Sequence, residues 1–138
     1  PQGPRRGPGV GRIMNPPEMA GWNLALRFGL EVAALTGLAT AAWRLSAEPW
    51  RWLAVIAVPL LAAIAWTTFN VPGDPSRSGE APVEVPGGVR LAVELAVLGA
   101  GSAGFLLTGS RAAGLAIAVL IVVHYATSLP RINWLLDT

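Results

Sequence analysis

The sequence predicts an all-α protein, a bundle of four transmembrane helices built from two parallel helical-hairpin repeats. Three observations lead to this prediction. The chain is 53% hydrophobic and only 13% charged, it contains four long apolar runs, and tryptophans mark the ends of these runs. A helix in a water-soluble bundle needs a polar face. None of the four runs has one, so we expect lipid to surround them.

A membrane-spanning helix needs about 20 mainly apolar residues, because each residue advances the helix by about 1.5 Å. Four runs meet this requirement, at about residues 22–43, 52–70, 89–107 and 112–129. Tryptophan prefers the level of the lipid headgroups. Most of the tryptophans lie at an expected end of a span, namely Trp22, Trp43, Trp50, Trp52 and Trp134.

The connections between the spans differ in length. Residues 44–51 and 108–111 form short turns, whereas residues 71–88 are rich in Pro and Gly and are expected to form a flexible loop. With four spans, both termini and this loop lie on one side of the membrane. Because arginine is more frequent on that side, we expect cytoplasmic termini in a bacterial inner membrane. The arginines compared are Arg5, Arg6, Arg12, Arg77 and Arg131 against Arg44, Arg51 and Arg111.

Residues 1–13, PQGPRRGPGVGRI, differ in composition from the rest of the chain. They lack the apolar core of a signal peptide and precede the first methionine, Met14. We interpret them as a disordered extension or an artificial addition. Residues 14–138 are expected to form a single four-span membrane domain.

The first and third spans share a sequence pattern, which indicates an internal repeat. RFGLEVAALTG begins at Arg27, and RLAVELAVLGA begins at Arg90. In each segment a glutamate follows four residues after the arginine, at Glu31 and Glu94. A repeat of two spans preserves topology, so the two halves are predicted to be parallel copies related by an axis along the membrane normal.

The expected spans bring polar side chains to one half of the membrane, on the side of the termini. Charged groups inside a bilayer are costly and usually face the interior of a bundle, and residues four apart share a helix face. We therefore predict a polar pocket or layer. Its members are Arg27, Glu31, Arg90, Glu94, His124, Tyr125, Trp66 and Asn70.

This polar layer has two interpretations. In the first, the Arg–Glu pairs form a dry cluster that fixes the register of the helices, as in a non-enzymatic structural or accessory membrane protein. In the second, they line a pocket open to one side, in which Glu31 or Glu94 exchanges protons or binds a small cation and His124 acts as a relay. The second interpretation predicts a small transporter or channel.

Small residues recur at steps of four along the first and third spans. Such residues let helices approach closely within a membrane, so we expect them to form a face for helix packing or homo-oligomerisation. The residues are Gly29, Ala33, Gly37, Ala92, Ala96, Ala100 and Gly104.

The composition argues against an enzyme. The chain has no cysteine and one histidine, and it lacks the nucleophile elbow, the phosphate-binding loop and the dinucleotide fingerprint. We expect no metal and no cofactor. The net charge of +2 and the absence of basic residues interleaved with aromatics argue against nucleic acid. The expected partners are the lipid bilayer and further copies of the chain, and the sequence identifies no small-molecule or ion ligand.

Three long segments resemble a known family. MNPPEMAGWNLALRFGLEVAAL, RWLAVIAVPLLAAIAWTTFNVP and GGVRLAVELAVLGAGSAGFLLTG are similar to the YrdB-like family of small bacterial four-helix membrane proteins. The most specific parts are LRFxLE, WxxFxxP and RLxxEL. The resemblance covers the chain from about residue 14 to the C-terminus. It implies the four-helix architecture and no mechanism, because the family has no established activity.

Overall fold

Three of the four long helices begin and end within two residues of the expected spans. The computed structural model describes residues 15–78 and 80–138. It contains the helices α1 (Gly21–Leu45), α2 (Trp50–Thr68), α3 (Gly87–Leu107), α4 (Arg111–Ala126) and α5 (Leu129–Leu136), and the strands β1 (Phe69–Asn70) and β2 (Val83–Glu84). The all-α prediction is confirmed. The extension expected at residues 1–13 lies outside the described residues.

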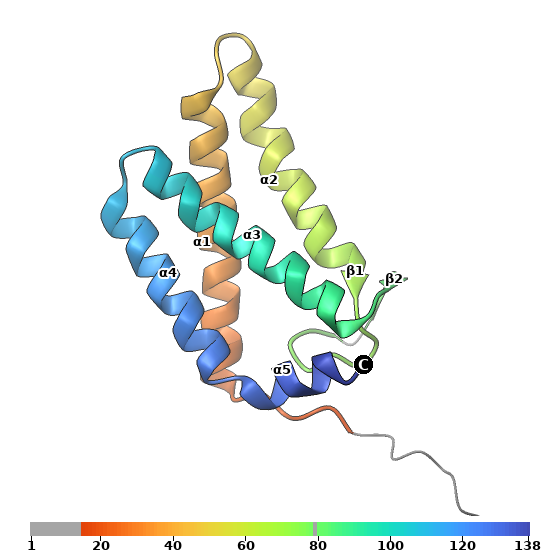
Figure 1. Ribbon diagram of the computed structural model, residues 1–138. Coiled ribbons are helices and arrows are strands. Elements are labelled where there is room, and N and C mark those ends of the chain that lie inside the picture. The colour runs from red at the N-terminus through yellow and green to blue at the C-terminus, as the bar shows by residue number, and fades with distance from the viewer. Residues whose placement is uncertain (1–14, 79) are drawn as a thin grey trace, which may run out of the picture.

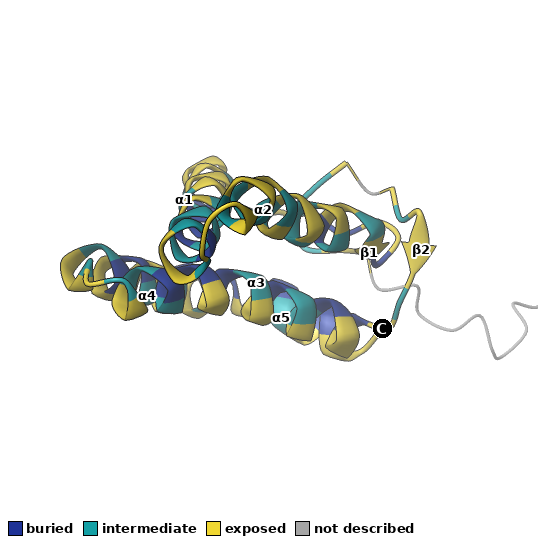
Figure 2. Ribbon diagram, turned by 90° about the horizontal axis from the view of Figure 1, so that it is seen from above, coloured by how far each residue is buried: buried dark blue, intermediate teal, exposed yellow. Residues whose placement is uncertain are grey.

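The helices form two packed layers (Figures 1 and 2). The hairpin of α1 and α2 makes one layer, and the hairpin of α3 and α4 makes the other, with α1 and α3 in contact where the layers meet. The turns of both hairpins lie at the same end of the molecule. The other end holds α5, the two strands and the start of α1, so it gathers the segments that the sequence places on the side of the termini.

The fourth expected span is shorter than predicted and is followed by a helix that the sequence analysis missed. α4 ends at Ala126, and α5 begins at Leu129 after a bend of 71°. Pro130 explains the break, because proline lacks the N–H that a continuing helix needs, yet it fits the first turn of a new one. The hydroxyls of Thr127 and Ser128 donate hydrogen bonds to the carbonyls of Val123 and His124, at 2.7 Å each.

Among the described residues, α1, α2 and α3 are each long and apolar enough to cross a membrane. α4 and α5 meet the requirement only together, as one bent span, so the chain has three or four candidate spans. The outward surface agrees with this assignment. In α2, Trp66 is the buried residue, while large apolar side chains such as Ile56 and Leu61 are about two-thirds exposed. Soluble monomers rarely expose so extensive an apolar surface.

Residues 71–88, expected to be flexible, make specific contacts in the structure. β1 and β2 pair in parallel, with Phe69 opposite Val83. Val71 and Asp74 are buried, at 4% and 1% exposure. The loop therefore folds back beneath the helices and brings Asp74 to their polar end.

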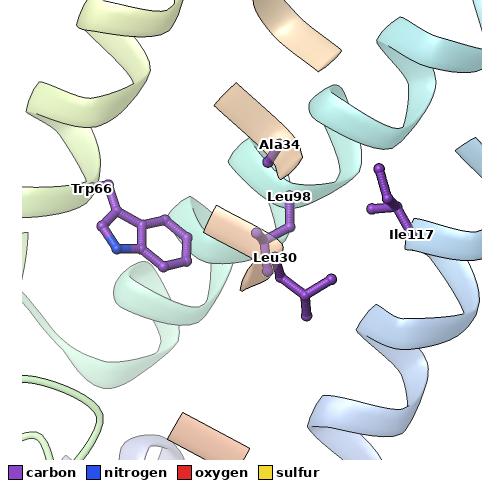
Figure 3. Packing of buried hydrophobic residues seen from close by; sticks show 5 residues of the cluster. All are labelled: Leu30, Ala34, Trp66, Leu98 and Ile117. Carbon is purple, nitrogen blue, oxygen red and sulfur yellow. The ribbon is translucent and has the colours of Figure 1, made fainter. Parts of the chain in front are cut away.

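A small apolar core lies between the layers (Figure 3). It takes Leu30 and Ala34 from α1, Trp66 from α2, Leu98 from α3 and Ile117 from α4. Each of the four long helices thus contributes to one cluster. The core is small because most apolar side chains of this protein point outward, so close backbone packing has a larger share in holding the layers together.

α1 and α3 touch through their backbones. A Cβ at Gly37 would lie 2.1 Å from the carbonyl oxygen of Gly101, and a Cβ at Gly101 would lie 2.3 Å from the Cα of Ala34. A Cβ at Gly104 would lie 2.5 Å from the carbonyl oxygen of Gly37. Only glycine fits at these three positions, and this close approach sets how far polar side chains of α1 must reach to meet α3.

The predicted face of small residues does not form one continuous face. Gly37 and Gly104 pack inside the protein, between α1 and α3, and Ala33 packs against the core. The reason is geometric, because each step of four residues rotates about 40° around a helix and a series of steps leaves its starting face. The remaining members are exposed, namely Gly29, Ala92, Ala96 and Ala100.

Candidate functional site

The polar end of the bundle is organised around Glu94 of α3, which is fully buried. Its carboxylate accepts six hydrogen bonds, five of them from guanidinium groups. A carboxylate offers about four lone-pair positions, so some of these bonds share a position. Such charge-assisted bonds are the strong ones in proteins. The donors are Arg27 at 2.6 and 3.2 Å, Arg90 at 2.8 Å, Arg131 at 2.6 and 3.1 Å, and the hydroxyl of Tyr125 at 2.7 Å.

The two Arg–Glu couples of the sequence behave differently. In α3, Arg90 bonds to Glu94 four residues later, as the spacing predicts. In α1, Arg27 turns away from Glu31 and binds Glu94 with both terminal nitrogens. The Nε of Arg27 lies 3.7 Å from Glu31, whose side chain is 29% exposed. The glycine contact between α1 and α3 brings Glu94 within reach of Arg27, and the buried carboxylate needs donors more than the exposed one does.

Arg131 and Asp74 complete the cluster, and the sequence analysis missed both as members. Arg131 lies in the first turn of α5 and is 1% exposed. It bonds to both carboxylate oxygens of Asp74, at 2.6 and 2.8 Å, as well as to Glu94. Burial alone would raise the pKa of Asp74, but the hydrogen bonds and charge of Arg131 outweigh it and hold that pKa below its usual range.

α5 is held against the start of α3 by a second close backbone contact. A Cβ at Gly87 would lie 1.7 Å from the carbonyl oxygen of Leu135. The apolar cluster of Val71, Trp134 and Leu135 packs α5 against the loop that follows β1. The signal for this arrangement in the sequence was the motif LPRINWLL, in which proline opens a short helix and arginine follows it.

His124 of α4 extends the network toward α1. Its Nε2 lies 3.3 Å from Nη1 of Arg27, and its Nδ1 is hydrogen-bonded to the side-chain oxygen of Asn23. A guanidinium only donates, so Nε2 accepts and Nδ1 carries the proton, which makes the ring neutral. Asn23, which was not predicted as a member of the polar layer, donates in turn to the hydroxyl of Thr127 at 3.2 Å. His124 is thus a fixed link between α1 and α4.

The end of α2 is tied to the cluster through Trp66. The guanidinium groups of Arg27 and Arg90 each lie 4.8 Å from the centre of its ring, a distance typical of cation–π contacts. Arg90 also donates to the carbonyls of Trp66 and Phe69, at 2.6 and 2.9 Å. These carbonyls at the end of a helix carry partial negative charge and need donors. Asn70 is buried nearby and donates to the carbonyl of Thr67, at 2.7 Å.

Beside the cluster lies a cavity of about 410 Å³ between α1, the end of α2 and residues 75–77. A second cavity of about 200 Å³ continues along α1 and α2. Glu31 and Trp66 line both. Of the predicted pocket residues, Arg27, Glu31 and Trp66 therefore line the cavities, whereas Glu94, Arg90 and His124 lie in the buried cluster. The larger cavity is lined by Leu24, Arg27, Phe28, Glu31, Trp66, Thr67, Pro75, Ser76 and Arg77.

The charges of the buried cluster balance when Glu31 at its edge is counted. Three buried arginines, Arg27, Arg90 and Arg131, face the buried carboxylates Glu94 and Asp74, and Glu31 supplies a third negative charge at the edge. Uncompensated charge is costly in a low-dielectric interior. In the part of the chain that the structure describes, no group of three or more acidic, histidine or cysteine side chains is arranged to hold a metal ion.

Apolar helices packed in two layers, with a buried arginine–carboxylate cluster at one end, define a small α-helical protein with three or four candidate membrane spans. The chain belongs to the protein family of unknown function DUF2568, whose model matches residues 25–122. It is 36% identical over 115 residues to the uncharacterized protein YrdB of Bacillus subtilis (strain 168), and this match covers 83% of this chain and 94% of that protein. The resemblance to the YrdB-like family is thereby confirmed. No solved structure matches the chain significantly.

Proposed function

We propose that this protein is a small, non-enzymatic integral membrane protein with a structural or accessory role, and that the buried charge cluster locks its helices together. One observation carries the proposal. Glu94 binds side chains from α1, α3, α4 and α5 at the same time, and Arg90 ties α2 to it through the carbonyl of Trp66.

The full occupancy of the Glu94 carboxylate favours a structural role over transport. A group that binds and releases a proton or an ion needs access to water and unoccupied coordination sites. Glu94 and Arg90 are fully buried and Arg131 is 1% exposed, and each oxygen of Glu94 already accepts three hydrogen bonds. Inside a membrane such groups are retained where they are paired with one another.

The proposal includes a topology and an assembly. α4 and α5 together form the fourth span, and the two hairpins are parallel repeats in a bacterial cytoplasmic membrane with cytoplasmic termini. Two observations support the repeat. The turns of both hairpins lie at one end of the molecule, and the couples Arg27–Glu31 and Arg90–Glu94 lie toward the other end. The exposed small residues Gly29, Ala92, Ala96 and Ala100 provide a surface on which copies of the chain associate.

The structural role is tested by comparing Glu94→Gln with its repeat counterpart Glu31→Gln. Removing the charge of Glu94 leaves three buried arginines short of a partner, so we expect a loss of about 3–5 kcal/mol in the free energy of unfolding. Glu31→Gln removes a partly exposed carboxylate 3.7 Å from its arginine, so we expect a much smaller loss. Thermal unfolding of the purified variants in one detergent measures both. Equal stability of the two variants would disprove the structural role of the cluster.

A second candidate function, a small transporter or channel for protons or small cations, rests on Glu31. This carboxylate lines two cavities and is not held by a short ion pair. In liposomes loaded with a pH-sensitive dye, the transporter hypothesis predicts proton or cation flux that Glu31→Gln abolishes while the unfolding temperature stays unchanged. Wild-type liposomes without flux above that of empty liposomes would rule this candidate out.

A further inference from the structure

The cavity beside the charge cluster has features that the structural role of the cluster does not use. It lies at the end of the bundle that holds the start of α1 and the C-terminus, between the first half of α1 and the end of α2. At the proposed membrane location, this level corresponds to the boundary between acyl chains and headgroups. Its volume of about 410 Å³ falls within the range of small-molecule sites, about 300–1,000 Å³.

Two opposite charges remain available in this cavity. Both terminal nitrogens of Arg27 are engaged with Glu94, so Arg27 adds little to binding. Glu31 makes no short ion pair, because the nearest guanidinium nitrogen, Nε of Arg27, is 3.7 Å away, and its other polar neighbour is the side chain of Trp66. Arg77 uses one nitrogen, Nη1, to bond to the carbonyls of Trp66 and Thr67 at 3.2 and 3.4 Å. Within residues 15–78 and 80–138, its other two nitrogens make no hydrogen bond.

A hydroxyl and an apolar surface complete the lining. The side-chain oxygen of Ser76 is buried and has no hydrogen bond of good geometry among the described residues. Its polar neighbour is Asp74, so rotation of this hydroxyl toward a ligand would give up only a weak contact. The backbone N–H of Ser76 donates to Asp74 at 2.9 Å, which fixes this part of the loop to the cluster. Phe28 is 67% exposed at the edge of the cavity, next to Leu24.

We propose that this cavity binds the headgroup of a zwitterionic phospholipid that carries a primary amine. The ammonium group pairs with Glu31, and the phosphate accepts hydrogen bonds from Arg77 and Ser76. One acyl chain lies over Phe28 and Leu24. A ligand with both charges matches the lining. An anionic headgroup would give Glu31 no positive partner and would place a second negative charge beside it. The proposal rests on the membrane location proposed above and is independent of whether the cluster is structural.

The test compares lipids that differ in one property. Wild-type protein in detergent is titrated with phosphatidylethanolamine, phosphatidylcholine and phosphatidylglycerol, and binding is measured by native mass spectrometry. We expect phosphatidylethanolamine to bind about tenfold more tightly than either of the other two, which corresponds to about 1.4 kcal/mol. Phosphatidylcholine retains the positive charge but cannot donate hydrogen bonds to Glu31, and phosphatidylglycerol lacks the positive charge.

Glu31→Gln and Arg77→Gln should each remove the preference for phosphatidylethanolamine. Glu48→Gln is the matched control, because Glu48 is an exposed carboxylate between α1 and α2, at the opposite end, and it should keep the preference. Equal binding of the three lipids by the wild type, or a preference that survives Glu31→Gln, would overturn the proposal. Equally tight binding of soluble phosphoethanolamine would overturn the assignment to a lipid. A protein that stays soluble without detergent would instead refute the membrane location.

Discussion

The contact between α3 and α5 allows a sharp test of how the charge cluster is assembled. In Gly87→Ala, the new Cβ would lie 1.7 Å from the carbonyl oxygen of Leu135, where ordinary contact begins at 3.4 Å. α5 must therefore move by about 1.7 Å, and the bonds of Arg131 to Glu94 and Asp74, both 2.6 Å, would open to roughly 4 Å, beyond hydrogen-bonding distance. Because the three charges stay buried, we expect a loss of about 3–5 kcal/mol.

Gly88→Ala is the matched control for this prediction. Gly88 is the next residue of the same helix, and a Cβ there would meet nothing within 4 Å. Alanine favours a helix over glycine by about 0.5–1 kcal/mol, so this variant should be as stable as the wild type or slightly more stable. The assay is thermal unfolding in detergent, followed by circular dichroism. Equal unfolding temperatures for the two variants would show that α5 does not position Arg131, and would refute the reasoning.

Two further predictions concern the loop and the packing of α1 against α3. Because the pKa of Asp74 is lowered in the folded protein, its contribution to stability is complete above about pH 4 and disappears as the pH falls through the lowered pKa. The difference in unfolding temperature between wild type and Asp74→Asn should therefore shrink below pH 4, and a difference independent of pH would contradict the ion pair with Arg131. Gly101→Ala should destabilise strongly because its Cβ would meet the backbone of Ala34 at 2.3 Å, whereas Gly99→Ala has open space. Similar urea midpoints for these two variants would argue against the backbone contact.

The helices could be predicted from the sequence because the length of an apolar run is a local property. The polar end could also be predicted, since Arg27, Glu31, Arg90 and Glu94 recur at one level of the first and third spans. The carboxylate that Arg27 binds could not be predicted. Arg27 binds Glu94 rather than Glu31 because the glycine contact between α1 and α3 brings the two helices together, and this contact depends on tertiary structure.

The same limit explains the residues that were missed. Asp74 and Arg131 are 57 positions apart, and each lies outside the expected spans, where a charged residue is ordinarily exposed. Only the bend after Ala126 and the fold of the loop bury them together. The small residues spaced four apart do not lie on one continuous face for a different reason, because each step of four residues rotates about 40° around the helix. Gly37 and Gly104 were therefore found on the inside and Ala100 on the outside.

The position of Arg131 near the C-terminus has a consequence for synthesis of the chain. When the first three helices have left the ribosome, their inward-facing charges already cancel, because Arg27 and Arg90 are matched by Glu31 and Glu94. Arg131 emerges last, and Asp74 meets it from the loop. Asp74 is made 57 residues before Arg131, but it lies in the loop between α2 and α3, outside the candidate spans. The charges inside the first three helices therefore cancel without either residue.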